Sequence, residues 1–92
     1  MYRHARRKDS NQRAIEKACL KIGATILDIS DKGQGAPDLL VGFRGVNYLF
    51  EIKANIKKKL TPDEITFART WQGKVTTIYT VIDAISILTI GF

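Results

Sequence analysis

The chain has 92 residues, the length of one domain, and 45% of them are hydrophobic, which is ordinary for a globular protein. No apolar run is long enough to span a membrane, and the N-terminus lacks the apolar core of a secretory signal, so a cytoplasmic protein is expected. With one cysteine, Cys19, and one histidine, His4, an internal disulfide and a Cys- or His-based zinc centre are excluded.

The chain is strongly basic. Fifteen Lys and Arg against nine Asp and Glu give a formal net charge of +6, which predicts a polyanionic partner. Many small basic proteins bind no nucleic acid, but here the basic residues cluster, which favours DNA binding. The expected DNA-binding residues are Arg3, Arg6, Arg7 and Lys8 in a basic N-terminal arm (residues 1–8), Lys32, and the run Lys57, Lys58 and Lys59.

The first predicted element after the arm is a helix that begins at Ser10 and ends at Gly23. Asp9 and Gln12 have the spacing of a capping box. An apolar stripe at helical spacing predicts the buried face, namely Ala14, Ile15, Ala18, Cys19 and Ile22. Glu16 falls at the border of that stripe. A catalytic or ligating carboxylate on a helix would lie there, but surface glutamates also do, and periodicity alone favours the surface interpretation.

A strand is predicted over residues 24–30, with Leu27 on one side and Ile26 and Asp28 on the other. Residues 31–36 form a loop by composition, and its glycines would let the backbone approach a phosphate or would simply connect two strands.

Residues 38–43 and 47–53 are predicted to form a β-hairpin around Arg44-Gly45. A two-residue loop would place Asp38 directly across from Glu51, whereas a four-residue loop, 44–47, would place Asp38 across from Lys53. Arginine before glycine is not a favoured turn pair, so the loop length stays open. In both registers all three charged side chains share one face of the sheet.

The three charged residues have two interpretations. Opposed carboxylates with Cβ atoms about 5 Å apart repel each other, and Mg²⁺ or Mn²⁺ bound by Asp38 and Glu51 would offset the repulsion. Lys53 would add a positive charge where a scissile phosphate could sit. Alternatively, Asp38 merely starts a strand after Pro37, and Glu51 and Lys53 pair at the surface. The apolar run 46–52 predicts burial on both faces, which favours the metal site.

The C-terminal third begins with a strong helix start at residues 60–64, where Thr61 is the N-cap and Glu64 occupies the third helical position. This helix is expected to end near Gln72. Its inward residues are expected to be Ile65, Ala68, Phe67 and Trp71, and helical spacing favours a core position for Trp71 over a base-stacking platform. A strand over residues 75–80 and a short packing helix over residues 83–89 complete the chain.

This arrangement resembles the PD-(D/E)XK nuclease superfamily and, more narrowly, its small virus-type VRR-NUC domains. The resemblance rests on Glu16 in the first helix, Asp38 after a proline, and Glu51-Ile52-Lys53 in the next strand. The sequences at 35–40, 60–62 and 71–73 extend it over nearly the whole chain. The fold it implies is α/β: a small mixed β-sheet flanked by helices, in the αβββαβ order of a restriction-endonuclease-like core, forming one nuclease domain over residues 1–92.

The resemblance also implies an activity, hydrolysis of DNA phosphodiester bonds by an endonuclease that depends on Mg²⁺ or Mn²⁺. Asp38 and Glu51 would be metal ligands together with the backbone carbonyl of Ile52. Lys53 would orient or activate the attacking water, and Glu16 would complete the site. Relatives often have Gln where this chain has Glu64, and the capping position of Glu64 leaves any active-site role of that helix open.

Similar compact nucleases cut DNA junctions as homodimers, so branched DNA such as a four-way junction and a second copy of the chain are the expected partners. The alternative function is a basic nucleic-acid-binding module that keeps the fold without cutting. A third possibility is an interaction protein whose basicity is incidental. The carboxylates separate the first two, because acidic groups near phosphates would only weaken a binding module.

Overall fold

The computed structural model describes residues 10–91, and it confirms the predicted α/β order. The elements are α1 (Ser10–Lys21), β1 (Thr25–Asp28), β2 (Leu39–Phe43), β3 (Val46–Ile52), α2 (Pro62–Thr70), β4 (Val75–Ile78) and α3 (Val81–Ile90). The sheet is mixed, with strand order β1-β2-β3-β4: the first two pairings are antiparallel and β3 pairs with β4 in parallel. None of the described helices is long and apolar enough to cross a membrane.

The β2–β3 hairpin has the shorter of the two predicted loops. Phe43 pairs with Val46 and the register continues to Leu39 opposite Phe50, so the four-residue loop is wrong. Arg44 and Gly45 both adopt positive φ, 52° and 80°, as a turn that follows the strand twist requires. The Arg44 guanidinium lies 4.8 Å from the centre of the Phe43 ring, a cation–π contact that offsets part of the strain of a non-glycine residue in this conformation.

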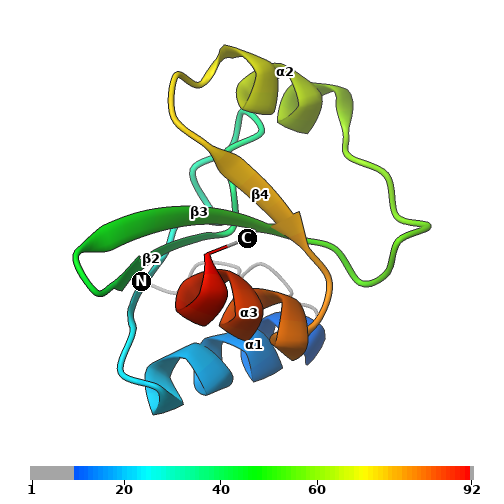
Figure 1. The fold of residues 1–92 in the computed structure, drawn as a ribbon. Helices are drawn as coiled ribbons and strands as arrows, with labels where there is room; N and C mark the ends of the chain where they lie inside the picture. Colours follow the sequence, from blue (N-terminus) through cyan, green and yellow to red (C-terminus); the bar gives the residue numbers. More distant parts are fainter. Residues whose placement is uncertain (1–9, 92) are drawn as a thin grey trace, which may run out of the picture.

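One face of the sheet packs against α1 and α3, which lie side by side beneath it in Figure 1. Alternate residues of β2 and β3 point into this layer, and α1 and α3 supply the facing side chains. The buried core consists of Ile15, Cys19, Ala24, Leu39, Val41, Phe43, Phe50, Ile52, Ile78, Ala84 and Leu88. The predicted stripe on α1 is therefore correct for Ile15 and Cys19, but Ala14 and Ile22 are exposed.

The C-terminal end of α1 is predicted correctly. Gly23, with φ of 97°, ends the helix as expected, because its N–H and that of Ala24 donate to the carbonyls of Leu20 and Cys19 in the last turn. At the other end, Gln12 makes a contact that the capping pattern does not predict. It is 5% exposed, and its Nε2 donates to a carboxylate oxygen one turn further along the helix. Asp9, its expected capping partner, lies outside the described residues.

Within residues 10–91, the second face of the sheet carries no helix along most of its length (Figure 1). Leu27 points to this face and is 58% exposed. Of the described helices, only α2 lies on this side, at the end of the sheet where β2 begins and β3 ends.

The predicted burial of α2 is wrong, because no residue of the helix is buried. Ile65 is 42% exposed, Trp71 is 50% exposed, and Ala68 is exposed as well. Trp71 stacks on Phe67 with ring centres 5.2 Å apart rather than entering the core. Helical spacing correctly predicts which residues share a face, but α2 stands off the sheet and nothing in the described chain covers that face.

Candidate active site

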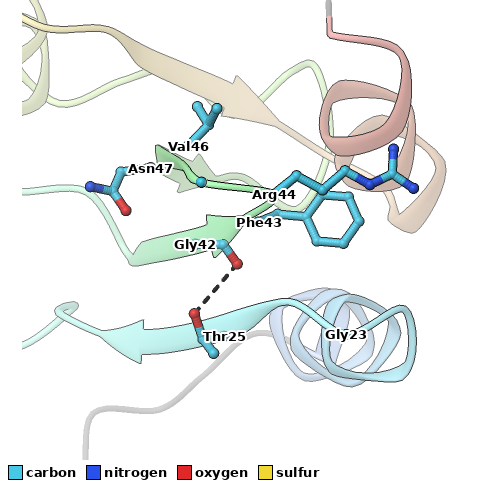
Figure 2. A pocket seen from close by; sticks show the side chains of 8 residues that line it. Gly23, Thr25, Gly42, Phe43, Arg44, Val46 and Asn47 are labelled. Atoms are coloured by element: carbon cyan, nitrogen blue, oxygen red, sulfur yellow. Dashed lines mark hydrogen bonds between the residues drawn. The ribbon is translucent and has the colours of Figure 1, made fainter.

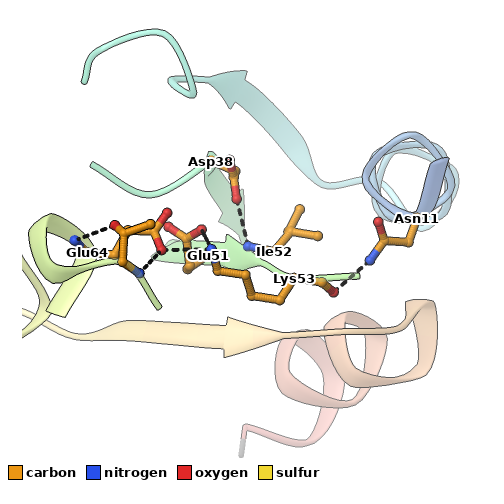
Figure 3. Close-up of polar contacts among 7 residues, drawn as sticks. Asn11, Asp38, Glu51, Ile52, Lys53 and Glu64 are labelled. Atoms are coloured by element: carbon orange, nitrogen blue, oxygen red, sulfur yellow. Dashed lines mark hydrogen bonds and ion pairs between the residues drawn. The ribbon is translucent and has the colours of Figure 1, made fainter. Parts of the chain in front are cut away.

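Asp38 is held by three hydrogen bonds at the point where β2 begins. Its N–H donates to the Phe50 carbonyl at 3.0 Å, and its carbonyl accepts from the Ile29 N–H at 2.9 Å. Its carboxylate oxygen Oδ2 accepts from the Ile52 N–H at 2.7 Å (Figure 3). Just before β2 begins, the Asp38 carboxylate thus accepts the hydrogen bond that a backbone carbonyl would accept from β3 within the sheet. This bond fixes the carboxylate against β3.

Glu51 lies beside Asp38 on the face of the sheet opposite the core, since its neighbours Phe50 and Ile52 point into the helix layer. It is 4% exposed, and its carboxyl lies close enough to Asp38 for the two groups to affect each other's pKa. Burial, and then the nearby charge of Asp38, raise the pKa of Glu51 to about 9. Burial raises the pKa of Asp38 as well, against the opposing effect of the Ile52 N–H. Without a metal, this environment therefore favours the protonated form of Glu51.

Lys53 extends from the end of β3 to the same cluster. Its Nζ lies 3.8 Å from Oε2 of Glu51 and 2.7 Å from Oε1 of Glu64, the closer partner (Figure 3). Burial would lower the pKa of Lys53. The hydrogen bond that Lys53 donates to Glu64 and the charges of the surrounding carboxylates raise this pKa overall. Burial would likewise raise the pKa of Glu64, yet the Lys53 ammonium and the Thr61 N–H lower it. The pair is therefore fully ionised at neutral pH.

The sequence predicts Glu64 only as part of the α2 cap, and that prediction is confirmed: Thr61 Oγ1 accepts from the Glu64 N–H, and Glu64 Oε1 accepts from the Thr61 N–H. The structure adds that the same carboxylate oxygen reaches Lys53. The sequence signal was present as an acidic residue at the start of the helix that follows the Glu-x-Lys strand, but nothing in the spacing showed where its carboxylate points.

Asn11 is a supporting residue that sequence reasoning missed. Its Nδ2 donates to the Lys53 carbonyl at 2.8 Å and to the Tyr79 carbonyl at 3.1 Å, tying the first turn of α1 to the ends of β3 and β4. Its Oδ1 is buried and has no hydrogen-bond partner among the described residues. From the sequence, an asparagine near a helix start is interpreted as a polar surface residue. Nothing in the neighbouring residues therefore predicts its contacts with the Lys53 and Tyr79 carbonyls.

Glu16, the fourth predicted site residue, lies on α1 and accepts a hydrogen bond from Gln12 Nε2 at 3.0 Å. It is partly buried, as its place at the border of the apolar stripe predicted. Within residues 10–91, no three His, Cys, Asp or Glu side chains are grouped so that they could hold a metal ion. The structure thus brings together Asp38, Glu51 and Lys53, with Glu64, and does not bring Glu16 into a joint ligand group with them.

Comparison with known proteins gave one informative result. No protein-family model matches the sequence, and no curated protein matches it either. Among solved structures, the chain is similar to a VRR_NUC domain with a TM-score of 0.63 and 26% sequence identity, over 83% of this chain and 87% of that one. The fold is that of a VRR_NUC nuclease domain. The match confirms the predicted resemblance to the PD-(D/E)XK nuclease superfamily.

The residues present fit the divalent metal that a VRR_NUC fold implies. Asp38 and Glu51 offer hard oxygen ligands, and the Ile52 carbonyl leaves β3 on the same side as its N–H, which faces Asp38. A divalent cation held by Asp38 and Glu51 would offset the repulsion between the two carboxylates and the cost of ionising the buried Glu51 side chain.

The predicted basic residues flank this cluster. Lys57, Lys58 and Lys59 are exposed in the connection from β3 to α2, and Lys32 is exposed in the connection from β1 to β2. Because β2 and β3 are antiparallel, the start of β2 and the end of β3 meet at one end of the sheet. Both connections therefore leave from the end that holds Asp38 and Glu51. The arm residues Arg3, Arg6, Arg7 and Lys8 lie outside the described residues.

A surface hollow lies at the other end of the same hairpin (Figure 2). It is open, about 400 Å³ in volume, and is lined by residues around the turn, including Gly23, Thr25, Gly42, Arg44 and Asn47. Arg44 is the charged residue of its lining, and no carboxylate contributes. No carboxylate lines this hollow, whereas Asp38 and Glu51 offer hard oxygen ligands, so the acidic cluster is the stronger candidate for a metal site.

Proposed function

We propose that this protein is a metal-dependent DNA endonuclease that hydrolyses phosphodiester bonds at the Asp38–Glu51 pair. The observation that carries the proposal is the convergence of the buried Glu51 carboxyl, the partly buried Asp38 carboxylate and Lys53 at one end of a sheet with the VRR_NUC fold. Asp38, Glu51 and the Ile52 carbonyl would hold Mg²⁺ or Mn²⁺. When bound, the ion would supply Lewis acidity toward a phosphate oxygen and a more acidic water.

The chain's own residues have distinct tasks in this proposal. The Ile52 N–H orients Asp38, so the carboxylate does not have to be immobilised when substrate arrives. The Lys53 ammonium, charged and only partly exposed, would attract a phosphate oxygen or orient the attacking water. Glu16 is proposed as a residue that assists from α1, whose first turn contacts the end of β3 through Asn11.

The proposed substrate is structured DNA, with a four-way junction as the favoured form. The exposed lysines at 32 and 57–59, together with the basic arm, would bind phosphates without reading base sequence. The net charge of +6 supports a polyanion, and the position of these lysines at the same end of the sheet as Glu51 supports binding next to the site of cleavage.

A homodimer is proposed on the basis of α2. A helix of 9 residues with no buried side chain is not stable by itself in water, and its apolar residues gain from a covering surface. We propose a second copy of the chain as that cover. Ile65→Asp should convert dimer to monomer in sedimentation velocity, while Ile82→Asp, at a 75%-exposed position on α3, should not. A monomeric wild type, or equal effects of the two substitutions, would reject this assembly.

The decisive experiment for the activity is cleavage of labelled linear, nicked, flapped and four-way DNA with and without Mg²⁺. Asp38→Ala, Glu51→Ala and Lys53→Ala should each abolish cleavage, whereas binding in Ca²⁺ survives. Asp63→Ala, which removes an exposed carboxylate from the first turn of α2, serves as the control and should cut normally. Cleavage that persists in the Asp38 or Glu51 variant refutes the assigned site. Binding of every substrate by a wild type that never cuts supports the binding module instead.

A further inference from the structure

The Glu64 carboxylate joins two parts of the molecule that the capping box alone does not connect. Its Oε1 accepts from the Thr61 N–H at 2.9 Å and from Lys53 Nζ at 2.7 Å. The first contact belongs to the start of α2, and the second reaches the end of β3. One oxygen atom therefore fixes the distance between the α2 N-terminus and the Lys53 ammonium.

The geometry favours Glu64 over Glu51 as the partner that sets the position of Lys53. The Nζ–Oε1 distance to Glu64 is that of a direct charge-assisted hydrogen bond, whereas the 3.8 Å to Glu51 is too long for one. The Lys53 and Glu64 side chains are only 16% and 18% exposed, so solvent screens the pair less than it would on the surface. Lysine has a long flexible side chain, and without this contact its ammonium would sample many positions.

The α2 N-terminus is itself well fixed, which makes Glu64 an effective anchor. Thr61 Oγ1 accepts from the Glu64 N–H, and the loop before Asp38 packs its backbone at Gly35 against the backbone at Asp63. A Cβ at Gly35 would collide with that backbone. The loop that leads to Asp38 and the helix that carries Glu64 are thus held together, and both lie beside the Asp38–Glu51 pair.

We propose that Glu64 is a positioning residue: its carboxylate fixes the Lys53 ammonium beside Asp38 and Glu51, and the importance of that position rests on the proposed nuclease function. Glu64 does not touch the substrate in this assignment. Its effect passes through Lys53, so loss of the Glu64 charge should slow the chemical step rather than weaken DNA binding.

The test compares wild type with Glu64→Gln and Thr61→Ala. Gln keeps an oxygen for the Thr61 N–H but loses the charge that holds Lys53, whereas Thr61→Ala weakens the cap and leaves the ion pair. Glu64→Gln should lower kcat by about 10- to 100-fold with KM changed less than about threefold, since small misplacement of a reacting group has effects of this size. Thr61→Ala should melt at a lower temperature yet keep kcat near the wild-type value.

A second readout does not depend on cleavage. The rate at which acetic anhydride modifies Lys53, measured by mass spectrometry relative to exposed Lys58, should rise at least about threefold in Glu64→Gln and stay unchanged in Thr61→Ala. An unchanged Lys53 rate in Glu64→Gln overturns the assignment, as does a loss of kcat that is equal in the two variants. If wild type cuts no DNA, the proposed function fails, and the acetylation rates alone decide whether Glu64 positions Lys53.

Discussion

Replacement of Glu51 by Gln should stabilise the metal-free protein at neutral pH while it removes a proposed metal ligand. Glu51 is 4% exposed and its pKa is raised to about 9 by burial and by Asp38. Gln has nearly the same shape, is neutral at every pH, and can donate to Asp38 as the protonated carboxyl does. The substitution therefore removes only the tendency of this side chain to ionise when the chain unfolds.

The magnitude follows from linkage between protonation and folding. The unfolded chain releases the Glu51 proton near pH 4.5, whereas the folded protein keeps it up to about pH 9. Below pH 4.5 both states are protonated and Glu51 causes no penalty; as pH rises toward 9, the penalty grows because only the unfolded state ionises. At pH 7 it amounts to roughly 3 kcal/mol, or a rise in Tm of roughly 10 to 20 °C for Glu51→Gln in a domain of this size.

The assay is thermal and urea unfolding followed by circular dichroism at pH 4, 5.5, 7 and 8.5 in EDTA. Glu16→Gln, the same chemical change on α1, is the matched control. Wild type and Glu51→Gln should agree at pH 4 and separate progressively above it. Parallel curves over the whole range would show that the fold does not keep Glu51 protonated, and the argument for a cation in place of that proton would fail with it.

Three further predictions address the metal, the DNA and the loop. Apparent affinity for Mg²⁺ should rise roughly tenfold per pH unit between about pH 5 and 9, because a proton must leave Glu51 before the metal binds. Calorimetry in two buffers of different ionisation enthalpy measures the release of this proton, and Mg²⁺ binding that is independent of pH contradicts the prediction. Substitution of lysines 57–59 by Gln should reduce the slope of log affinity against log salt by about two to three units, and an unaltered slope would show that these residues contact no phosphate. Gly35→Ala should lower the free energy of unfolding by about 2 kcal/mol or more in urea, because φ is 78° and the new Cβ meets the Asp63 backbone. Gly33→Ala, with φ of 75° and open space around the new Cβ, is the control and should lower it by about 1 kcal/mol. Equal losses would mean that the contact between Gly35 and Asp63 is unimportant.

The sequence was sufficient for features that depend on neighbouring residues or on strand alternation. Turn chemistry at Arg44-Gly45 allowed two registers, and both placed Asp38 and Glu51 on one face, as observed. The Thr61 cap and the Gly23 helix end follow from local backbone needs and appear where predicted. These features need no knowledge of what lies across the molecule.

The features that sequence analysis missed all depend on distant contacts. The period of α2 shows that Ile65 and Ala68 share a face, but it contains no information on whether another surface covers that face. Glu64 has a complete local explanation as a capping residue, and that explanation hid its contact with Lys53, eleven positions earlier in the chain.

Binding of Mn²⁺ by the purified protein, measured by electron paramagnetic resonance at pH 8, tests the central idea that Asp38 and Glu51 together hold one cation. Wild type should bind one ion per chain, and Asp38→Asn and Glu51→Gln should each abolish the site while circular dichroism shows them folded. A wild type that leaves all Mn²⁺ free in solution, or either variant binding as tightly as wild type, would contradict the account.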